Sequence, residues 1–116
     1  MSLRVAALLA LVLVTGGAEP AAAACSVHTT RNFVRKADLP DGAIAAFGIP
    51  MAERGTPFQA TDVLDSRRPL PSTRFVQARQ VNCALAVRYE QGGIAHTWQT
   101  AQLWWNGNRW VLVRRR

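Results

Sequence analysis

The pattern of hydrophobic and polar residues changes near residue 73. From there to the C-terminus, apolar and polar residues tend to alternate, with many Val and Trp. Such alternation is typical of half-buried β-strands, and turns containing glycine separate the last three segments. We therefore predict a C-terminal antiparallel β-meander of three or four strands. The four segments are Arg74–Val81, Cys83–Glu90, Ile94–Trp105 and Arg109–Arg115.

Two turn sequences predict the registers of this meander. Asn106-Gly107 is the strongest short hairpin signal in the chain, and Gly92-Gly93 is a second one. If both are two-residue turns, Tyr89, Val87 and Trp98 share one face of the sheet. The predicted facing pairs are Trp104 with Arg109, Leu103 with Trp110, Tyr89 with His96, Val87 with Trp98, and Leu85 with Thr100.

Residues 26–72 are interrupted by Pro and Gly, which excludes long helices. Two short helical pieces are predicted, at Ala43–Phe47 and Met51–Arg54, where Pro50 suits a first turn and Gly55 suits the position after the last. Small residues at Ala84, Ala86, Ala95 and Ala101 would let the 43–64 region approach one face of the sheet closely.

The fold class that follows is α+β: one small domain, irregular or short-helical over residues 25–72 and sheet over 73–116. A chain of 116 residues allows one core, which excludes multidomain enzymes and large cofactor-binding folds.

The first 24 residues have the order of a secretory signal peptide. Arg4 precedes ten apolar residues from Val5 to Val14, and Ala22-Ala23-Ala24 offers a cleavage site before Cys25. Ten apolar residues are too few for a bilayer, which needs about 20. We predict removal of 1–24, a single exported domain over 25–116 without a transmembrane segment, and a periplasmic or secreted location. The many Ala and Arg residues suggest a GC-rich bacterium.

Two cysteines remain after that cleavage, and an even count in an exported protein predicts a disulfide, Cys25 to Cys83. Closing so long a loop is worth about 4 kcal/mol in the chain-entropy model. The alternative is a bacterial lipoprotein with lipid on Cys25 and a free thiol at Cys83. It is disfavoured because Ala22 occupies the position where such signals carry a leucine-like residue.

Positive charge is concentrated in the second half of the chain. The formal net charge is +7, and residues 67–116 contain nine basic residues and one acidic residue, against four and five in residues 25–66. All four tryptophans also lie in the last 19 residues. A cationic surface attracts acidic polymers and phosphates.

No catalytic, nucleotide-binding or redox motif is present, and we predict no catalytic residue, cofactor or metal. His28, His96 and the two cysteines lack the close spacing of a zinc site. An alternative is a small secreted ribonuclease-like hydrolase that uses Glu90, His96 and Arg88. The predicted register opposes it, because His96 falls on the other face from Arg88 and Glu90.

The leading hypothesis is a non-catalytic binding module for an anionic envelope component or a partner protein. A periplasmic inhibitor or immunity-type protein is a close variant, and no motif for specific nucleic-acid recognition is present. Trp104 and Trp105 should point to opposite faces of their strand. The candidate binding residues are Arg67, Arg68, Trp104, Trp105, Arg109, Arg114, Arg115 and Arg116.

Overall fold

The computed structural model describes residues 25–63 and 69–116. The predicted signal peptide and the candidate residues Arg67 and Arg68 lie outside these ranges. In the described part of the chain, no helix has both the length and the apolar character needed to cross a bilayer.

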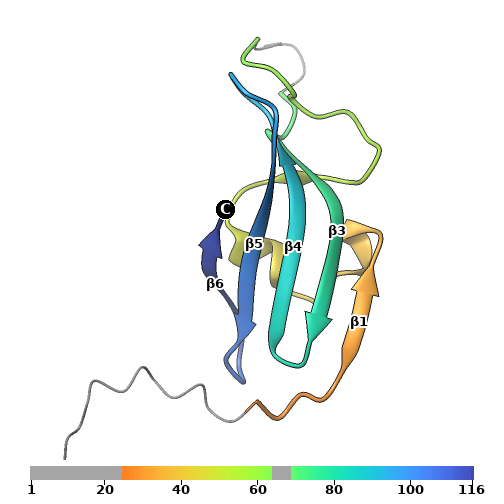
Figure 1. Ribbon diagram of the computed structural model, residues 1–116, viewed down its shortest axis with the longest axis vertical. Coiled ribbons are helices and arrows are strands. Elements are labelled where there is room, and N and C mark those ends of the chain that lie inside the picture. Colours follow the sequence, from red (N-terminus) through yellow and green to blue (C-terminus); the bar gives the residue numbers. More distant parts are fainter. Residues whose placement is uncertain (1–24, 64–68) are drawn as a thin grey trace, which may run out of the picture.

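The protein is a mostly antiparallel β-sheet with few helical residues (Figure 1). The sheet order is β1-β3-β4-β5-β6, and β2 pairs with β3 in parallel. Strands β3 to β6 are antiparallel neighbours in chain order, as the alternation predicts. Strand β1, which we did not predict from the sequence, pairs with β3 at the edge of this meander. The elements are β1 (Thr30–Phe33), a 3-10 turn η1 (Lys36–Asp38), α1 (Ala43–Phe47), β2 (Met51–Ala52), β3 (Thr73–Val81), β4 (Ala84–Gln91), β5 (Thr97–Trp105) and β6 (Trp110–Arg115).

The helix predicted at Ala43–Phe47 is confirmed as α1. Glycines with positive φ flank it, Gly42 at 84° and Gly48 at 89°, a region where a side chain is strained. Ala43 and Phe47, four residues apart, are both buried, so one face of this short helix points into the core.

The second predicted helix, Met51–Arg54, is wrong. Met51 and Ala52 form strand β2, whose register with β3 pairs Met51 with Thr73. Both β2 residues are buried, and Thr73 Oγ1 donates a hydrogen bond to the Pro50 carbonyl at 2.9 Å. Burial of the segment against β3 therefore overrides the helical signal of its flanking Pro and Gly.

The register predicted from Gly92-Gly93 is also wrong. The β4–β5 loop has five residues, 92–96, and the pairs are Tyr89 with Gln99, Val87 with Ala101 and Leu85 with Leu103. This three-residue shift exchanges the faces of β5 relative to β4. Glycine is needed at position 92 for a close contact and not for a tight turn, because a Cβ there would collide with the backbone of residues 59–60.

The second hairpin differs from its prediction by two residues, which preserves the faces. Its loop spans 106–109, and Asn106 Oδ1 accepts the N–H groups of Asn108 and Arg109, both at 2.9 Å. Trp105 pairs with Trp110 and Leu103 with Leu112, in place of Trp104 with Arg109 and Leu103 with Trp110. An irregularity farther along β6 then shifts the pairing by one residue, which brings Arg115 opposite Ala101.

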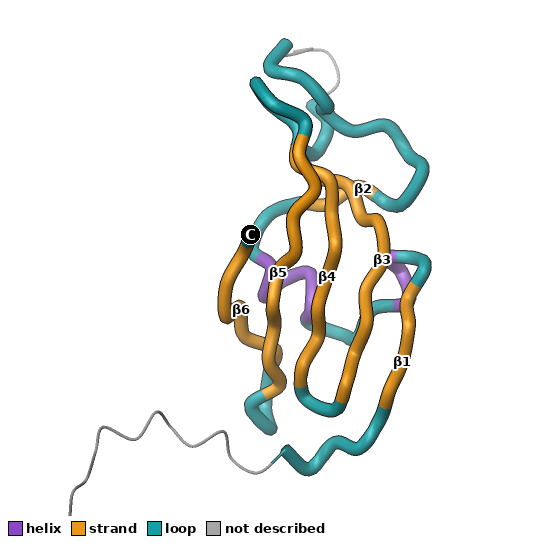
Figure 2. Tube along the Cα trace, in the orientation of Figure 1, coloured by secondary structure: helices purple, strands orange, loops and turns teal. Residues whose placement is uncertain are grey.

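The core lies between α1 and one face of the sheet, which we call the covered face (Figure 2). Phe47 meets Tyr89 edge to face, with ring centroids 4.8 Å apart. The prediction that the 43–64 region covers one face lined by alanines is wrong. The shifted register places Ala101 beside Val87 on the covered face and leaves Ala84 and Ala86 on the other face. The buried cluster contains Phe33, Leu39, Ala43, Phe47, Met51, Phe75, Ala78, Leu85, Val87, Tyr89, Ala101, Leu103 and Trp110.

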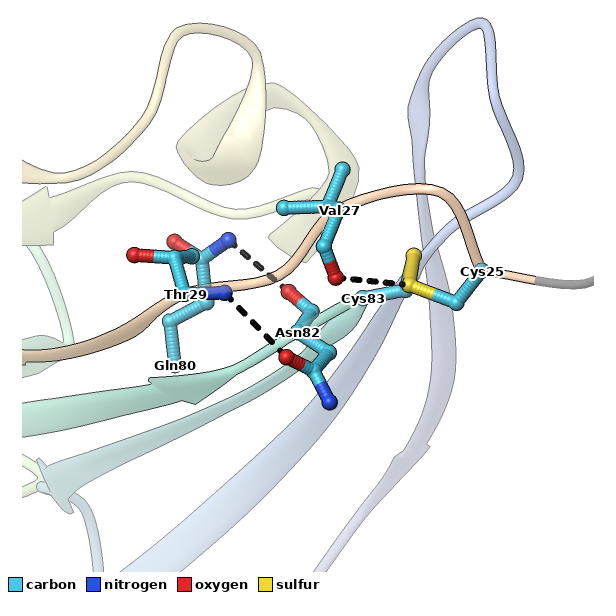
Figure 3. Close-up of a disulfide and its surroundings, with 6 residues drawn as sticks. All are labelled: Cys25, Val27, Thr29, Gln80, Asn82 and Cys83. Carbon is cyan, nitrogen blue, oxygen red and sulfur yellow. Dashed lines mark hydrogen bonds between the residues drawn. A yellow bond between two sulfur atoms is a disulfide. The ribbon is translucent and has the colours of Figure 1, made fainter.

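The predicted disulfide joins Cys25 to Cys83, with Cα atoms 5.8 Å apart (Figure 3). It fastens the segment before β1 to the β3–β4 turn, where Asn82 N–H donates to the Thr29 carbonyl at 2.7 Å and Asn82 Oδ1 accepts from Thr29 N–H at 3.1 Å. Because each sulfur is bonded to the other, this form of the protein carries neither a lipid thioether on Cys25 nor a cysteine-ligated metal.

Candidate anion-binding face

The second face of the sheet, here called the open face, is the one turned toward the viewer in Figure 1, with α1 behind it. Its residues alternate with those of the core along each strand, so the same alternation that buries Leu85 and Val87 directs their neighbours outward. The open face comprises Thr30 and Asn32 of β1, Arg74, Gln77, Arg79 and Val81 of β3, Ala84, Ala86, Arg88 and Glu90 of β4, Trp98, Thr100, Gln102 and Trp104 of β5, and Val111 and Arg114 of β6.

A hollow of about 360 Å³ lies near the middle of this face. The short side chain of Ala86 stands opposite Arg79 on one side and Gln102 on the other, which leaves space above the strand. Longer polar side chains border that space, together with the apolar Phe33, Val34 and Ala78. The open-face residues that line the hollow are Asn32, Gln77, Arg79, Ala86, Arg88 and Thr100.

The charged side chains that line the hollow are all positive. Within residues 25–63 and 69–116, the ion pairs join Arg35 to Asp38 and both Arg74 and His96 to Glu90, so neither Arg79 nor Arg88 has a carboxylate within 4 Å. Both arginines are exposed. Two guanidinium groups without a bound carboxylate, on one rigid surface, produce a positive potential that favours an anion.

A polar cluster lies at the end of the open face near the β4–β5 loop. Arg74 holds both oxygens of Glu90, Nε to Oε2 at 2.5 Å and Nη2 to Oε1 at 3.1 Å, and His96 Nε2 lies 3.2 Å from Oε1. The hydrogen bond from Arg74 lowers the pKa of Glu90 and raises that of Arg74, despite opposing effects of burial. The prediction that His96 lies on the other face is wrong, because the five-residue loop turns it toward Glu90.

Aromatic rings extend this cluster toward solvent. The Arg74 guanidinium lies 4.3 Å from the Phe58 ring centroid, and Phe58 meets the His96 ring edge to face at 5.7 Å. His96 in turn stacks on Trp98, with centroids 4.6 Å apart and planes inclined by 21°. Trp98 nevertheless remains 56% exposed, so an indole held in place by its neighbours is still available to solvent.

The sequence-predicted binding residues do not form one patch. Trp104 and Arg114 lie on the open face, whereas Trp105 is on the covered face, 5.7 Å from the Trp110 ring. Arg109 is exposed in the β5–β6 loop.

The last two arginines are tied to the fold. Arg115 lies 4.9 Å from the Phe47 ring centroid and donates to the Phe47 carbonyl. The Arg116 backbone N–H donates to the Thr100 carbonyl at 2.9 Å. These two residues support the sheet end and α1, and the C-terminal arginines do not act as one free basic tail.

Sequence reasoning did not select Arg79 or Arg88 as residues of a non-catalytic binding site and considered them only for catalysis. A signal was present: Arg88 follows two alternating alanines at 84 and 86, so large and small open-face positions neighbour each other on β4. What the sequence lacks is the register, which brings Arg79 opposite Ala86 and Arg88 opposite Gln77.

Comparisons with models of protein families, with curated proteins and with solved structures find no match to this chain.

Proposed function

We propose that this protein is an exported binding protein that holds an anionic ligand on its open face. One observation carries the proposal: Arg79 and Arg88 share a central hollow in which neither has a carboxylate partner among the described residues. Export is supported by the Cys25–Cys83 disulfide, since such bonds persist in oxidising compartments, and by the signal-peptide pattern of residues 1–24.

The recognition chemistry follows from the guanidinium group. Its planar array of donors matches carboxylate and phosphate oxygens, and hydrogen bonds between ionised groups are stronger than neutral ones. Gln77 and Thr100 border the same hollow and supply further polar contacts. Because these side chains come from adjacent strands, the spacing of their Cα atoms is fixed before the ligand arrives, so binding does not have to order the backbone.

Trp104 and Arg114 extend the positive and aromatic surface toward β6, consistent with a ligand longer than a single ion. An acidic polymer of the cell envelope fits this surface. An inhibitor or immunity-type protein would bind the acidic surface of a protein partner through the same arginines. Neither a cofactor nor a metal is part of the proposal.

The test compares two double variants with the same charge change. Arg79→Gln with Arg88→Gln removes both arginines of the hollow, and Arg31→Gln with Arg109→Gln removes two exposed arginines outside the open face. With inorganic polyphosphate as the probe, we expect the first pair to weaken binding about tenfold or more and to reduce its salt dependence. Equal weakening by both pairs would show that net charge alone is responsible.

A second candidate function is ribonuclease-like hydrolysis, favoured by the 3.2 Å contact between His96 and Glu90 on the face that also carries Arg88. A carboxylate can act as a general base and an imidazole as a general acid. The hydrogen bond from Arg74 keeps the pKa of Glu90 low, which makes it a weak base. We expect no RNA cleavage; cleavage lost in both His96→Ala and Glu90→Gln would establish the second function instead.

A further inference from the structure

The open face contains a diagonal track that runs across four neighbouring strands. Trp98 on β5 faces Glu90, two residues from Arg88 on β4, and Arg88 faces Gln77, two residues from Arg79 on β3. Arg79 faces Asn32 on β1. Diagonal neighbours of this kind are about 7 Å apart, so an exposed indole and two guanidinium groups follow one another in two such steps, and the Asn32 amide stands directly opposite the second guanidinium.

The indole at the start of the track is held in a defined position. His96 covers one face of the Trp98 ring, and His96 is itself fixed by Phe58 and by the Glu90 carboxylate. Since Trp98 is still 56% exposed, the molecule keeps a large aromatic surface in water at a fixed place. An aromatic side chain in this position is a platform for the apolar face of a ring.

The negative charge beside the track does not oppose an anionic ligand. Glu90 lies directly opposite Trp98, but both of its oxygens accept hydrogen bonds from Arg74, and its side chain is only 12% exposed. The neighbouring positive charges are Arg88 and Arg79, and the neutral groups around them are amides and a hydroxyl.

We infer that the anionic ligand of the open face is an acidic glycan, with one sugar ring stacked on Trp98 and its carboxylate or phosphate groups on Arg88 and Arg79. This inference rests on the proposed function and adds the chemical class of the ligand. Sugar rings supply the C–H face that an indole contacts and the hydroxyl groups that Asn32, Gln77 and Thr100 hydrogen-bond.

Two other polyanions fit the track less well. Polyphosphate has the charge but no ring for Trp98. A single-stranded nucleic acid stacks successive bases on successive aromatic side chains, whereas this track continues from one indole to two guanidinium groups.

The experiment uses the protein purified with its disulfide intact and measures dissociation constants at one salt concentration. The probes are an oligogalacturonate, inorganic polyphosphate and oligo(dT), matched in charge. Trp98→Ala is compared with Ile94→Ala, which removes a 96% exposed apolar side chain from the same end of the molecule, and Trp98→Phe tests whether another aromatic ring restores binding. Circular dichroism confirms that each variant is folded.

We expect Trp98→Ala to weaken oligogalacturonate binding about fivefold to tenfold, Trp98→Phe to restore most of it, and polyphosphate binding to change less than about twofold. Ile94→Ala should leave all three probes unaffected. If Trp98→Ala alters glycan binding no more than Ile94→Ala does, the glycan is excluded while the anion site stands. If oligo(dT) binds more tightly than oligogalacturonate and its binding depends on Trp98, the ligand is a nucleic acid and not a glycan. If the Arg79→Gln, Arg88→Gln protein binds polyphosphate as tightly as the wild type does, the proposed anion site itself is wrong.

Discussion

The two faces of the sheet use the same alternating strands for different purposes. On the covered face, Leu85, Val87 and Tyr89 pack against α1 and are almost completely buried. On the open face, the residues between them are the half-buried Ala86 and the exposed Arg88. Charged groups in the first setting would be costly to desolvate, whereas in the second they stay hydrated and retain their capacity to bind. Stability should therefore depend on one face and ligand binding on the other.

The largest effect is expected from Phe47→Ala. This side chain is 1% exposed, contacts Tyr89 and anchors α1 on the sheet. Its removal should lower the free energy of unfolding by about 3–5 kcal/mol, as is usual when a buried aromatic ring is deleted. Urea denaturation measures this. The open-face counterpart Trp98→Ala should cost less than about 1 kcal/mol; similar losses would contradict the division between the faces.

A second large effect is expected from the disulfide, which supports the sheet from its end. Replacing both Cys25 and Cys83 with Ala should lower the free energy of unfolding by about 2–4 kcal/mol, because the open chain gains entropy when unfolded. Reductant should have a similar effect on the wild-type protein and none on the variant. Polyanion binding by the fraction that remains folded should be unchanged, since neither cysteine lines the hollow that contains Arg79 and Arg88.

An intermediate effect is expected at Glu90, the carboxylate that Arg74 and His96 hold on the open face. Its pKa is lowered in the folded protein, mainly by the hydrogen bond from Arg74, so its ionised form stabilises the fold above the unfolded-state pKa near 4.5. That contribution should disappear as pH falls through the lower, folded-state value. Glu90→Gln should cost about 1–3 kcal/mol at pH 7.

The pH dependence of the free energy of unfolding tests the contribution of the Arg74–Glu90 ion pair. Unfolding measured at pH 7 and at pH 3 should show the difference between wild type and Glu90→Gln becoming smaller in acid. Asp38→Asn is the control, because the Arg35–Asp38 pair is exposed and should contribute less than about 0.5 kcal/mol. A difference for Glu90→Gln that is constant with pH would mean that the carboxylate charge does not stabilise the fold.

The smallest effect on stability is expected at the arginines of the hollow. Arg79→Gln and Arg88→Gln should each change the free energy of unfolding by less than about 0.5 kcal/mol, since both side chains are exposed and neither has a carboxylate partner in the described part of the chain. Thermal melts of the two variants test this. A loss above about 1 kcal/mol would make these arginines structural.

Much of this fold is predictable from local sequence signals. Alternation marked the four strands β3 to β6, two glycines marked the ends of α1, and the cysteine count marked the disulfide. These signals work because they depend on neighbouring residues or on a single pairing. β1 and β2 were missed because they are four and two residues long and are defined by pairing with a distant strand.

The candidate site was less predictable because it depends on register. The Gly92-Gly93 pair resembles a tight turn, yet Gly92 allows the backbone of residues 59–60 to approach, a contact between distant parts of the chain. The resulting three-residue shift moves Trp98 next to Glu90 and places Arg88 beside Thr100. The residue types at the site were therefore visible in the sequence, whereas their grouping was not.

The most direct test of the division between the faces is a polyanion titration followed by the NMR signals of the arginine Nε–Hε groups. The protein is titrated with inorganic polyphosphate, and the signals of Arg79 and Arg88 are compared with those of Arg31 and Arg109. We predict that Arg79 and Arg88 shift together along one saturable curve while Arg31 and Arg109 move little. Equal, unsaturated shifts of all four signals would contradict a defined anion site on the open face.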